Sequence, residues 1–159
     1  MLYLRANSAR KDAQGKRRNE AEMNKIFWAA DSTVQTNDFT KYPQTGIGQV
    51  FPLFVKNEYQ IVNHAKNGRS TKSFMDEGRL KAIEEQIGAG DFLFIQFGHN
   101  DEKKEDPTRF TEPFSTYMEN LETFIRVARD HSAYPVLIAD ASWMKNIWES
   151  VRIPTMWQL

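Results

Sequence analysis

Three short polar clusters in the sequence contain residue types that could carry out chemistry together. Asp31-Ser32-Thr33 supplies a carboxylate and two hydroxyl groups directly after an apolar run. Gly68 lies in a polar stretch after a second apolar run, and Asn100 follows a third. Acyl transfer needs a nucleophile, a base and hydrogen-bond donors for the developing oxyanion. Ser32 could be the nucleophile, while the backbone N–H of Gly68 and the side chain of Asn100 could be the donors.

The elements that must position these clusters are short apolar segments. Each is rich in β-branched or aromatic residues, which is typical of strands covered on both faces of a sheet. The four predicted strands are Ile26–Ala30, Tyr59–Val62, Asp91–Phe97 and Pro135–Ala139. Apolar residues at helical spacing predict helices between them. These helical stretches cover residues 47–55, residues 80–87 and residues 114–128, whose aromatic side chains we expect in the core.

Strands that alternate with helices predict a parallel sheet with helices on both faces, that is, a three-layer α/β/α sandwich. In such a sheet, ligands bind outside the carboxyl ends of the strands. The three polar clusters should therefore meet along one edge of the sheet. The competing interpretation is that Asp31-Ser32-Thr33 is only a polar turn after a buried strand. Asp31 itself could orient the Ser32 loop through backbone hydrogen bonds or simply cap it.

The clusters also resemble the motifs of a known family. A strand ending in "ADST", a later "GRS" and a third block "FGHND" are similar to the first three motif blocks of the SGNH/GDSL hydrolases. The longer stretches "NHAKNGRSTKSFMDEGRL" and "GDFLFIQFGHND" most resemble the rhamnogalacturonan acetylesterase branch, and the resemblance covers about residues 24–140.

This resemblance implies a flavodoxin-like fold and a serine esterase that removes acetyl groups from pectin-type saccharides, without a metal or cofactor. It implies Ser32 as the nucleophile, and the N–H groups of Ser32, Gly68 and Asn100 as the oxyanion hole. The partner implied is an acetylated saccharide substrate. A flavin- or nucleotide-binding domain on the same fold is disfavoured, because the loop after the first strand has no phosphate-binding glycine pattern.

The sequence departs from the family pattern in two ways. Ala30 stands where the family has a glycine before the Asp-Ser pair, and the late Asp-x-x-His block that carries the general base is absent from this chain. We therefore expect a hydrolase domain over residues 23–159 that lacks the last strand and helix. An alternative function is a catalytically impaired or non-catalytic saccharide-binding module.

The chain contains three histidines that could replace the missing base. His99 is next to Asn100 at the predicted edge, where we expect it to support the site by stabilising a loop. His131 precedes the fourth predicted strand and should lie at a helix end, at the opposite edge of the sheet. His64 follows the second predicted strand and should belong to the loop scaffold.

Composition and charge narrow the range of partners. The formal net charge is zero, so no overall field attracts nucleic acid or an anionic membrane. No apolar run approaches the roughly 20 residues that span a bilayer.

The absence of cysteine excludes disulfides and is compatible with the cytoplasmic location that we predict. Residues 1–22 predict a disordered basic arm, and an uncovered sheet edge predicts self-association.

Overall fold

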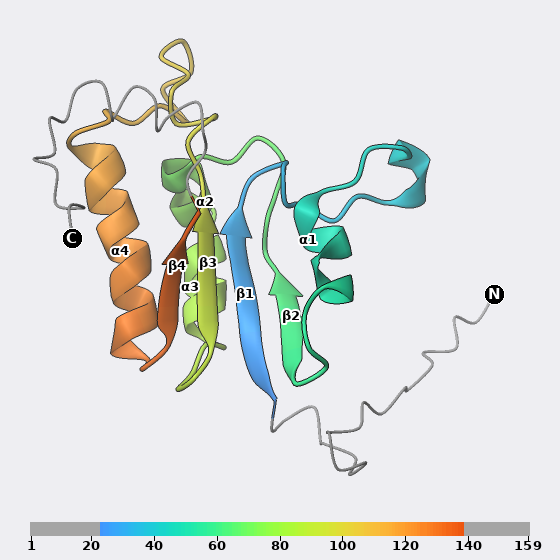
Figure 1. Cartoon of the computed structure of the whole chain (residues 1–159). Coiled ribbons are helices and arrows are strands. Elements are labelled where there is room, and N and C mark those ends of the chain that lie inside the picture. The colour runs from blue at the N-terminus through green and yellow to red at the C-terminus, as the bar shows by residue number, and fades with distance from the viewer. Residues whose placement is uncertain (1–22, 139–159) are drawn as a thin grey trace, which may run out of the picture.

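A computed structural model describes residues 23–138, which contain a four-stranded parallel sheet (Figure 1). The strands are β1 (Asn24–Ala30), β2 (Tyr59–Asn63), β3 (Phe92–Gln96) and β4 (Tyr134–Leu137). They lie in the order β2-β1-β3-β4, and every neighbouring pair is parallel. All four predicted strands are confirmed, with boundaries that differ by at most two residues. The predicted arm at 1–22 and the predicted loss of a last strand and helix lie outside the described residues.

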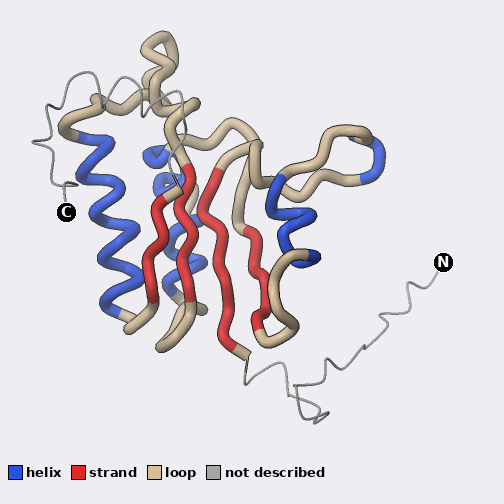
Figure 2. Tube along the Cα trace, in the orientation of Figure 1, coloured by secondary structure: helices blue, strands red, loops and turns tan. Residues whose placement is uncertain are grey.

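Helices cover both faces of the sheet, which confirms the predicted three-layer arrangement. One face packs against α2 (Thr71–Asp76), α3 (Arg79–Glu84) and α4 (Thr116–Asp130). The other packs against α1 (Ile47–Val50) and the 3-10 turn η3 (Phe51–Leu53); the 3-10 turn η2 (Phe39–Lys41) lies between β1 and α1. The loops after β1, β2 and β3 leave the sheet at the same end (Figure 2).

The strand pleat divides the apolar residues between two cores. Because successive side chains of a strand point to opposite faces, β1 sends Phe27 and Ala29 into the core beneath α2, α3 and α4. It sends Trp28 and Ala30 into the core on the α1 side. The methyl group of Ala30, in place of the family's glycine, is therefore fully buried in the second core.

Three phenylalanine rings connect the elements that end near the predicted site. Phe74 of α2, Phe97 just after β3 and Phe124 of α4 have ring centroids 5.2 to 5.8 Å apart. Aromatic pairs at such distances contribute about 1 kcal/mol each beyond the burial of their surface. This packing holds α2 against the end of β3, so the loops that precede α2 and follow β3 are neighbours.

The prediction that every strand is covered on both faces is wrong for the edge strands. The central strands are largely buried, whereas the edge strands are partly exposed. The last five residues of β1 are all buried, whereas every residue of β2 is half-buried. In β4, Tyr134 and Leu137 are 58% and 54% exposed. The difference arises because an edge strand has a neighbour on one side only within the described sheet.

The apolar stripes at helical spacing predict more buried side chains than the helices contain. Phe114, expected in the core, is 62% exposed because it precedes the start of α4 and lies off its buried face. Met118, from the same stripe, is 46% exposed. Ile47 and Phe54 are 51% and 82% exposed, since α1 has only one turn and the helical period does not continue through η3.

Helix α2 was not predicted, because its sequence has no long apolar stripe. It begins with a capping box in which Ser70 Oγ accepts a hydrogen bond from Ser73 N at 3.2 Å. Ser73 Oγ accepts one from Ser70 N at 2.9 Å. Gly78, with φ of 72°, then separates α2 from α3. Local polar capping, rather than hydrophobic periodicity, therefore decides where this helix begins.

Helix α1 packs directly on the loop that follows β1. Ile47 N donates to Thr33 O at 2.8 Å, and Gly48 N donates to Val34 O at 3.2 Å. The close approach requires glycine at position 46, because a Cβ there would lie 2.1 Å from a backbone carbonyl oxygen of the loop. The one-turn helix therefore supports the loop that carries Ser32.

We expect Gly46→Ala to lower the free energy of unfolding by about 1–3 kcal/mol, because the loop after β1 must move to admit the methyl group. Urea unfolding measures this loss. Gly88→Ala is the matched control, since a Cβ at Gly88 meets only the Asp91 carboxylate at 4.0 Å. Equal stability of the two variants would contradict the close packing of α1 on this loop.

Candidate active site

Strand β1 ends in a turn that presents Ser32 at the carboxyl end of the sheet. Asp31 is 2% exposed, and its Oδ1 accepts hydrogen bonds from Thr33 N at 3.0 Å and from Thr33 Oγ1 at 2.9 Å. Thr33 Oγ1 accepts a further bond, at 2.8 Å, from Nε2 of Gln96 at the end of β3. Asp31 therefore orders the Ser32 loop and connects it to the neighbouring strand.

The Ser32 side chain is half-buried and makes no hydrogen bond to any residue within 23–138. Its neighbours Asp31 and Thr33 bond to each other. The hydroxyl is thus held by the turn around it rather than by a partner of its own.

The loop after β2 begins beside the end of β1, where Lys66 N donates to Ala30 O at 3.0 Å. Gly68 follows with φ of 77°, a left-handed conformation that favours glycine. Arg69 is held by Glu77, with Nε–Oε2 and Nη2–Oε1 distances of 3.0 and 2.6 Å. This ion pair, together with a second one from Arg79, lowers the pKa of Glu77.

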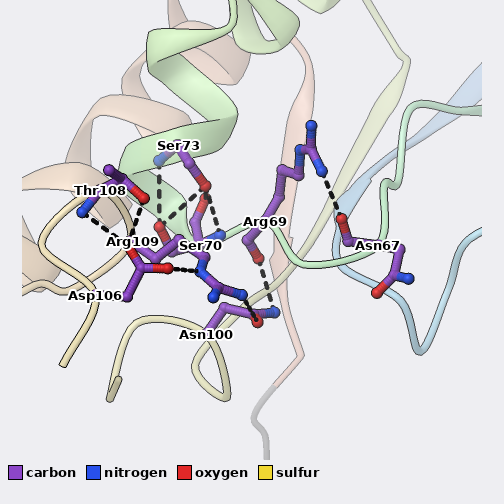
Figure 3. Close-up of polar contacts among 8 residues, drawn as sticks. All are labelled: Asn67, Arg69, Ser70, Ser73, Asn100, Asp106, Thr108 and Arg109. Atoms are coloured by element: carbon purple, nitrogen blue, oxygen red, sulfur yellow. Dashed lines mark hydrogen bonds and ion pairs between the residues drawn. The ribbon is translucent and has the colours of Figure 1, made fainter. Parts of the chain in front are cut away.

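Asn100 connects the three polar loops, and Figure 3 shows its contacts with Arg69 and Arg109. It is 2% exposed, and its Nδ2 donates to Asp31 Oδ2 at 3.3 Å and to Arg69 O at 3.1 Å. Its Oδ1 accepts a hydrogen bond from Arg109 Nη1 at 3.3 Å. Asn100 therefore contacts the residue before Ser32 and the residue after Gly68. The expected meeting of the three loops at one edge of the sheet is present.

A second buried carboxylate lies behind Asn100. Asp101 is fully buried, and its Oδ1 accepts hydrogen bonds from Thr71 N at 3.0 Å, from Thr71 Oγ1 and from Thr111 Oγ1 at 3.0 Å. Burial raises the pKa of Asp101 to about 6, although the hydrogen bonds from Thr71 and Thr111 lower it; the negative charge of Asp31 contributes to the rise. Asp101 caps the start of α2 and so holds the Gly68 loop against the Asn100 loop.

None of the three histidines is hydrogen-bonded to the Ser32 hydroxyl within residues 23–138. His99 is 58% exposed at its side chain, and its Nδ1 lies 3.4 Å from Glu102 Oε1. His131 follows the last residue of α4, as predicted, with Nδ1 2.8 Å from a backbone carbonyl of that helix. His64 is half-buried, and burial lowers its pKa. The supporting role of His99 stays a prediction.

Sequence reasoning missed the residues that hold these loops together. Thr71 and Thr111 bind Asp101, and Arg109 binds Asn100 across a separation of nine residues. Asp101 stands in the "FGHND" block, but nothing in the sequence indicates that Thr71 and Thr111 are its partners. Arg109 lies outside the motif blocks and has no local signature.

Two negative findings concern the described part of the chain. Between residues 23 and 138, no group of three or more His, Cys, Asp or Glu side chains is placed to hold a metal ion. No helix in that range is long and apolar enough to cross a membrane. At the carboxyl edge of the sheet, Asn100 is hydrogen-bonded to Asp31 and to Arg69.

Gly68→Ala is expected to cost about 1–2 kcal/mol of stability, because alanine is strained at a φ of 77°. Space does not limit this position, since the added Cβ would lie 3.7 Å from its nearest neighbour. Thermal unfolding measures the loss. Gly68→Asn is the matched control and should lose less, because asparagine tolerates the left-handed conformation. Equal losses for both variants would place the cost in the new side chain rather than in the backbone.

Comparison with known proteins identifies relatives of this chain. No family model matches the chain. It is 47% identical over 116 residues to the probable rhamnogalacturonan acetylesterase YesY of Bacillus subtilis, covering 72% of this chain and 52% of that protein. It is 46% identical over 113 residues to the rhamnogalacturonan acetylesterase RhgT of the same organism, covering 71% and 47%. The chain thus spans about half the length of the curated relatives it matches.

A solved structure agrees with these relatives. The crystal structure of YxiM from Bacillus subtilis matches with a TM-score of 0.66 and 26% identity, covering 72% of this chain and 32% of that one. The parallel sheet and these similarities together place the chain in the SGNH/GDSL class. Within that class, the chain belongs to the rhamnogalacturonan acetylesterase-like branch.

Proposed function

We propose that this chain provides the nucleophile and the oxyanion hole of a serine esterase that removes acetyl groups from pectin-type saccharides, including rhamnogalacturonan. The observation that carries the proposal is the contact of Asn100 with Asp31 and with Arg69, which holds the Ser32 and Gly68 loops at one edge. The names of the relatives, which are rhamnogalacturonan acetylesterases, support the substrate class.

In the proposed reaction, the Ser32 oxygen attacks the carbonyl carbon of the acetyl group while a base accepts the hydroxyl proton. The bond between that carbon and the sugar oxygen then breaks, and the protonated base gives its proton to that oxygen, so the sugar leaves as an alcohol. Water hydrolyses acetyl-Ser32 and releases acetate. The backbone N–H groups of Ser32 and Gly68 and the Asn100 side chain stabilise the oxyanion, at roughly 3 kcal/mol for one donor.

The contacts of Asn100 indicate how it can favour the transition state. Both hydrogens of its Nδ2 are already directed at acceptors, and the bond to Asp31 Oδ2 is the longer one, at 3.3 Å. A developing oxyanion is a far stronger acceptor than the neutral carbonyl of the bound ester. Exchange of the Asp31 contact for the oxyanion would therefore be favourable mainly in the transition state, which is the condition for a higher kcat.

The second candidate function is binding of an acetylated saccharide without turnover. It is favoured by the absence of a hydrogen bond from any imidazole to the Ser32 hydroxyl within residues 23–138. Without a base, the Ser32 oxygen keeps its proton and is a weak nucleophile. Loss of a triad member lowers the rate by about four to six decades.

One experiment separates the two functions. The chain is mixed with acetylated and deacetylated rhamnogalacturonan fragments, acetate release is followed, and binding is measured by calorimetry. Mass spectrometry of the peptide that contains Ser32 tests for an acetyl adduct. Acetate release with the adduct supports the esterase, and preferential binding of the acetylated fragment without release supports the binding module. The absence of both release and binding would refute both.

Two further expectations belong to this proposal: the cytoplasmic location and self-association through a sheet edge. Within residues 23–138 the two edges of the sheet are β2 and β4, and Tyr134 and Leu137 of β4 are largely exposed. Cell fractionation tests the location, and analytical ultracentrifugation of the purified chain tests the association. Recovery of the protein in the medium would contradict the cytoplasmic location. A monomer at all concentrations would contradict the self-association.

A further inference from the structure

Arg109 lies against two of the three loops that supply the proposed oxyanion donors, the Gly68 loop and the Asn100 loop. Its Nη1 donates to Asn100 Oδ1 at 3.3 Å, and the same nitrogen is 3.7 Å from the position that a Cβ on Gly68 would occupy. Figure 3 shows the guanidinium group between the carboxamide of Asn100 and the carboxylate of Asp106. The side chain is 30% exposed, so it is held within the site rather than solvated at its surface.

The guanidinium group is itself fixed by a local turn. Its Nε donates to Asp106 Oδ2 at 2.6 Å, and the Arg109 backbone N–H donates to Asp106 O at 3.0 Å. The other carboxylate oxygen of Asp106 accepts a hydrogen bond from Thr108 N at 3.0 Å. Because arginine carries several donors in a rigid planar group, one side chain can bind Asp106 and Asn100 at once.

The contacts with Arg109 and Asp31 together decide which end of the Asn100 carboxamide faces the Ser32 loop. A carboxamide has a donor end and an acceptor end. Rotation by half a turn would direct Oδ1 at Asp31 Oδ2 and at a backbone carbonyl, which are both acceptors. It would also direct the NH₂ group at the guanidinium, which only donates. Arg109 and Asp31 therefore select the same orientation from opposite ends of the carboxamide.

We propose that Arg109 is a positioning residue of this site, which keeps Asn100 Nδ2 directed at the Ser32 loop as an oxyanion donor. The catalytic consequence rests on the proposed esterase function, whereas the orientation of Asn100 does not. Loss of Arg109 should therefore lower kcat and leave KM nearly unchanged, because the donor acts on the oxyanion and not on the bound ester.

The test compares Arg109→Met, Arg109→Lys and the control Arg79→Met in the full chain. Arg79 matches Arg109 well: its side chain is also 30% exposed, and its Nε binds a carboxylate at 2.8 Å. NMR follows the side-chain amide of Asn100 and needs no turnover. We expect both Arg109 variants to shift its resonances and to speed its hydrogen exchange by about tenfold, as loss of one hydrogen bond predicts. Arg79→Met should leave the amide unchanged.

With acetylated fragments as substrate, we expect Arg109→Met to lower kcat by about 10- to 100-fold, as small displacements of catalytic groups do. Lysine should not rescue it, because a single ammonium cannot reproduce the arginine fork. An unchanged Asn100 amide in Arg109→Met, the same change in Arg79→Met, or full rescue by lysine would overturn the proposal. If the Asn100 amide changes in the Arg109 variants but Ser32→Ala keeps full turnover, the positioning role of Arg109 stands. The proposed esterase function of Ser32 is then rejected.

Discussion

Acetate release above the uncatalysed rate is expected to be lost when Ser32 is replaced by alanine, a change that costs serine hydrolases with a complete triad about four to six decades in rate. The physical reason is that no acyl-enzyme can form without the Ser32 oxygen, so only the oxyanion donors and substrate binding still contribute. Initial rates of acetate release from acetylated rhamnogalacturonan measure the effect.

The same substitution should leave the fold intact, because the Ser32 hydroxyl makes no hydrogen bond to residues 23–138. We expect the free energy of unfolding to change by less than about 0.5 kcal/mol. Ser115→Ala is the matched control, since Ser115 is exposed and its side chain does not cap α4. Equal rates for Ser32→Ala and the unaltered chain would exclude Ser32 as the nucleophile.

Replacing Asp101 by alanine is expected to cost about 3 kcal/mol of stability. The change leaves the backbone N–H and hydroxyl of Thr71 and the hydroxyl of Thr111 without an acceptor in a buried site. Buried donors without a partner cost about 1–3 kcal/mol each, and rotation of the hydroxyls recovers part of the loss. Urea unfolding at neutral pH measures the difference.

Asp101→Asn is the matched control for this loss. Its carbonyl oxygen can take the place of Oδ1, which accepts from Thr71 N, Thr71 Oγ1 and Thr111 Oγ1. Only the bond from Thr71 N to Oδ2, at 3.1 Å, is replaced by an N–H group. We therefore expect the asparagine variant to be clearly more stable than the alanine variant. Equal stabilities would mean that these hydrogen bonds do not hold the two loops together.

The same pair of proteins gives a pH test with a defined sign. The pKa of Asp101 rises from its ordinary value of 3.8 to about 6 in the folded chain. The folded state thus binds more protons than the unfolded state in this window, so the stability contributed by Asp101 falls as the pH rises from about 4 to about 6. At about 1.4 kcal/mol per pKa unit, the whole change is about 3 kcal/mol.

Subtraction of the Asp101→Asn stability curve isolates this change. Burial lowers the pKa of His64, so its contribution has the opposite slope, but it is present in both proteins and cancels. We expect the unaltered chain to lose stability relative to Asp101→Asn between about pH 4 and pH 6, and to remain constant above that range. A flat difference curve would show that the three hydrogen bonds offset the burial of the charge.

The sequence by itself determined the strands and the residues that follow them. Each strand is a local apolar run, and each candidate, Ser32, Gly68 or Asn100, lies within a few residues of a strand end. Such signals depend on neighbours along the chain, which explains why the boundaries agree within two residues. The motif blocks were also sufficient to indicate the family, because they are contiguous in sequence.

Only the tertiary structure decided which side chains hold the three loops together. The order β2-β1-β3-β4 places the loops after β1, β2 and β3 side by side, and no local pattern specifies that order. Asn100 reaches Asp31 across 69 residues, and Asp101 reaches Thr71 across 30. These bonds have no signature in sequence, because any buried polar side chain takes the partner that packing places within hydrogen-bonding distance.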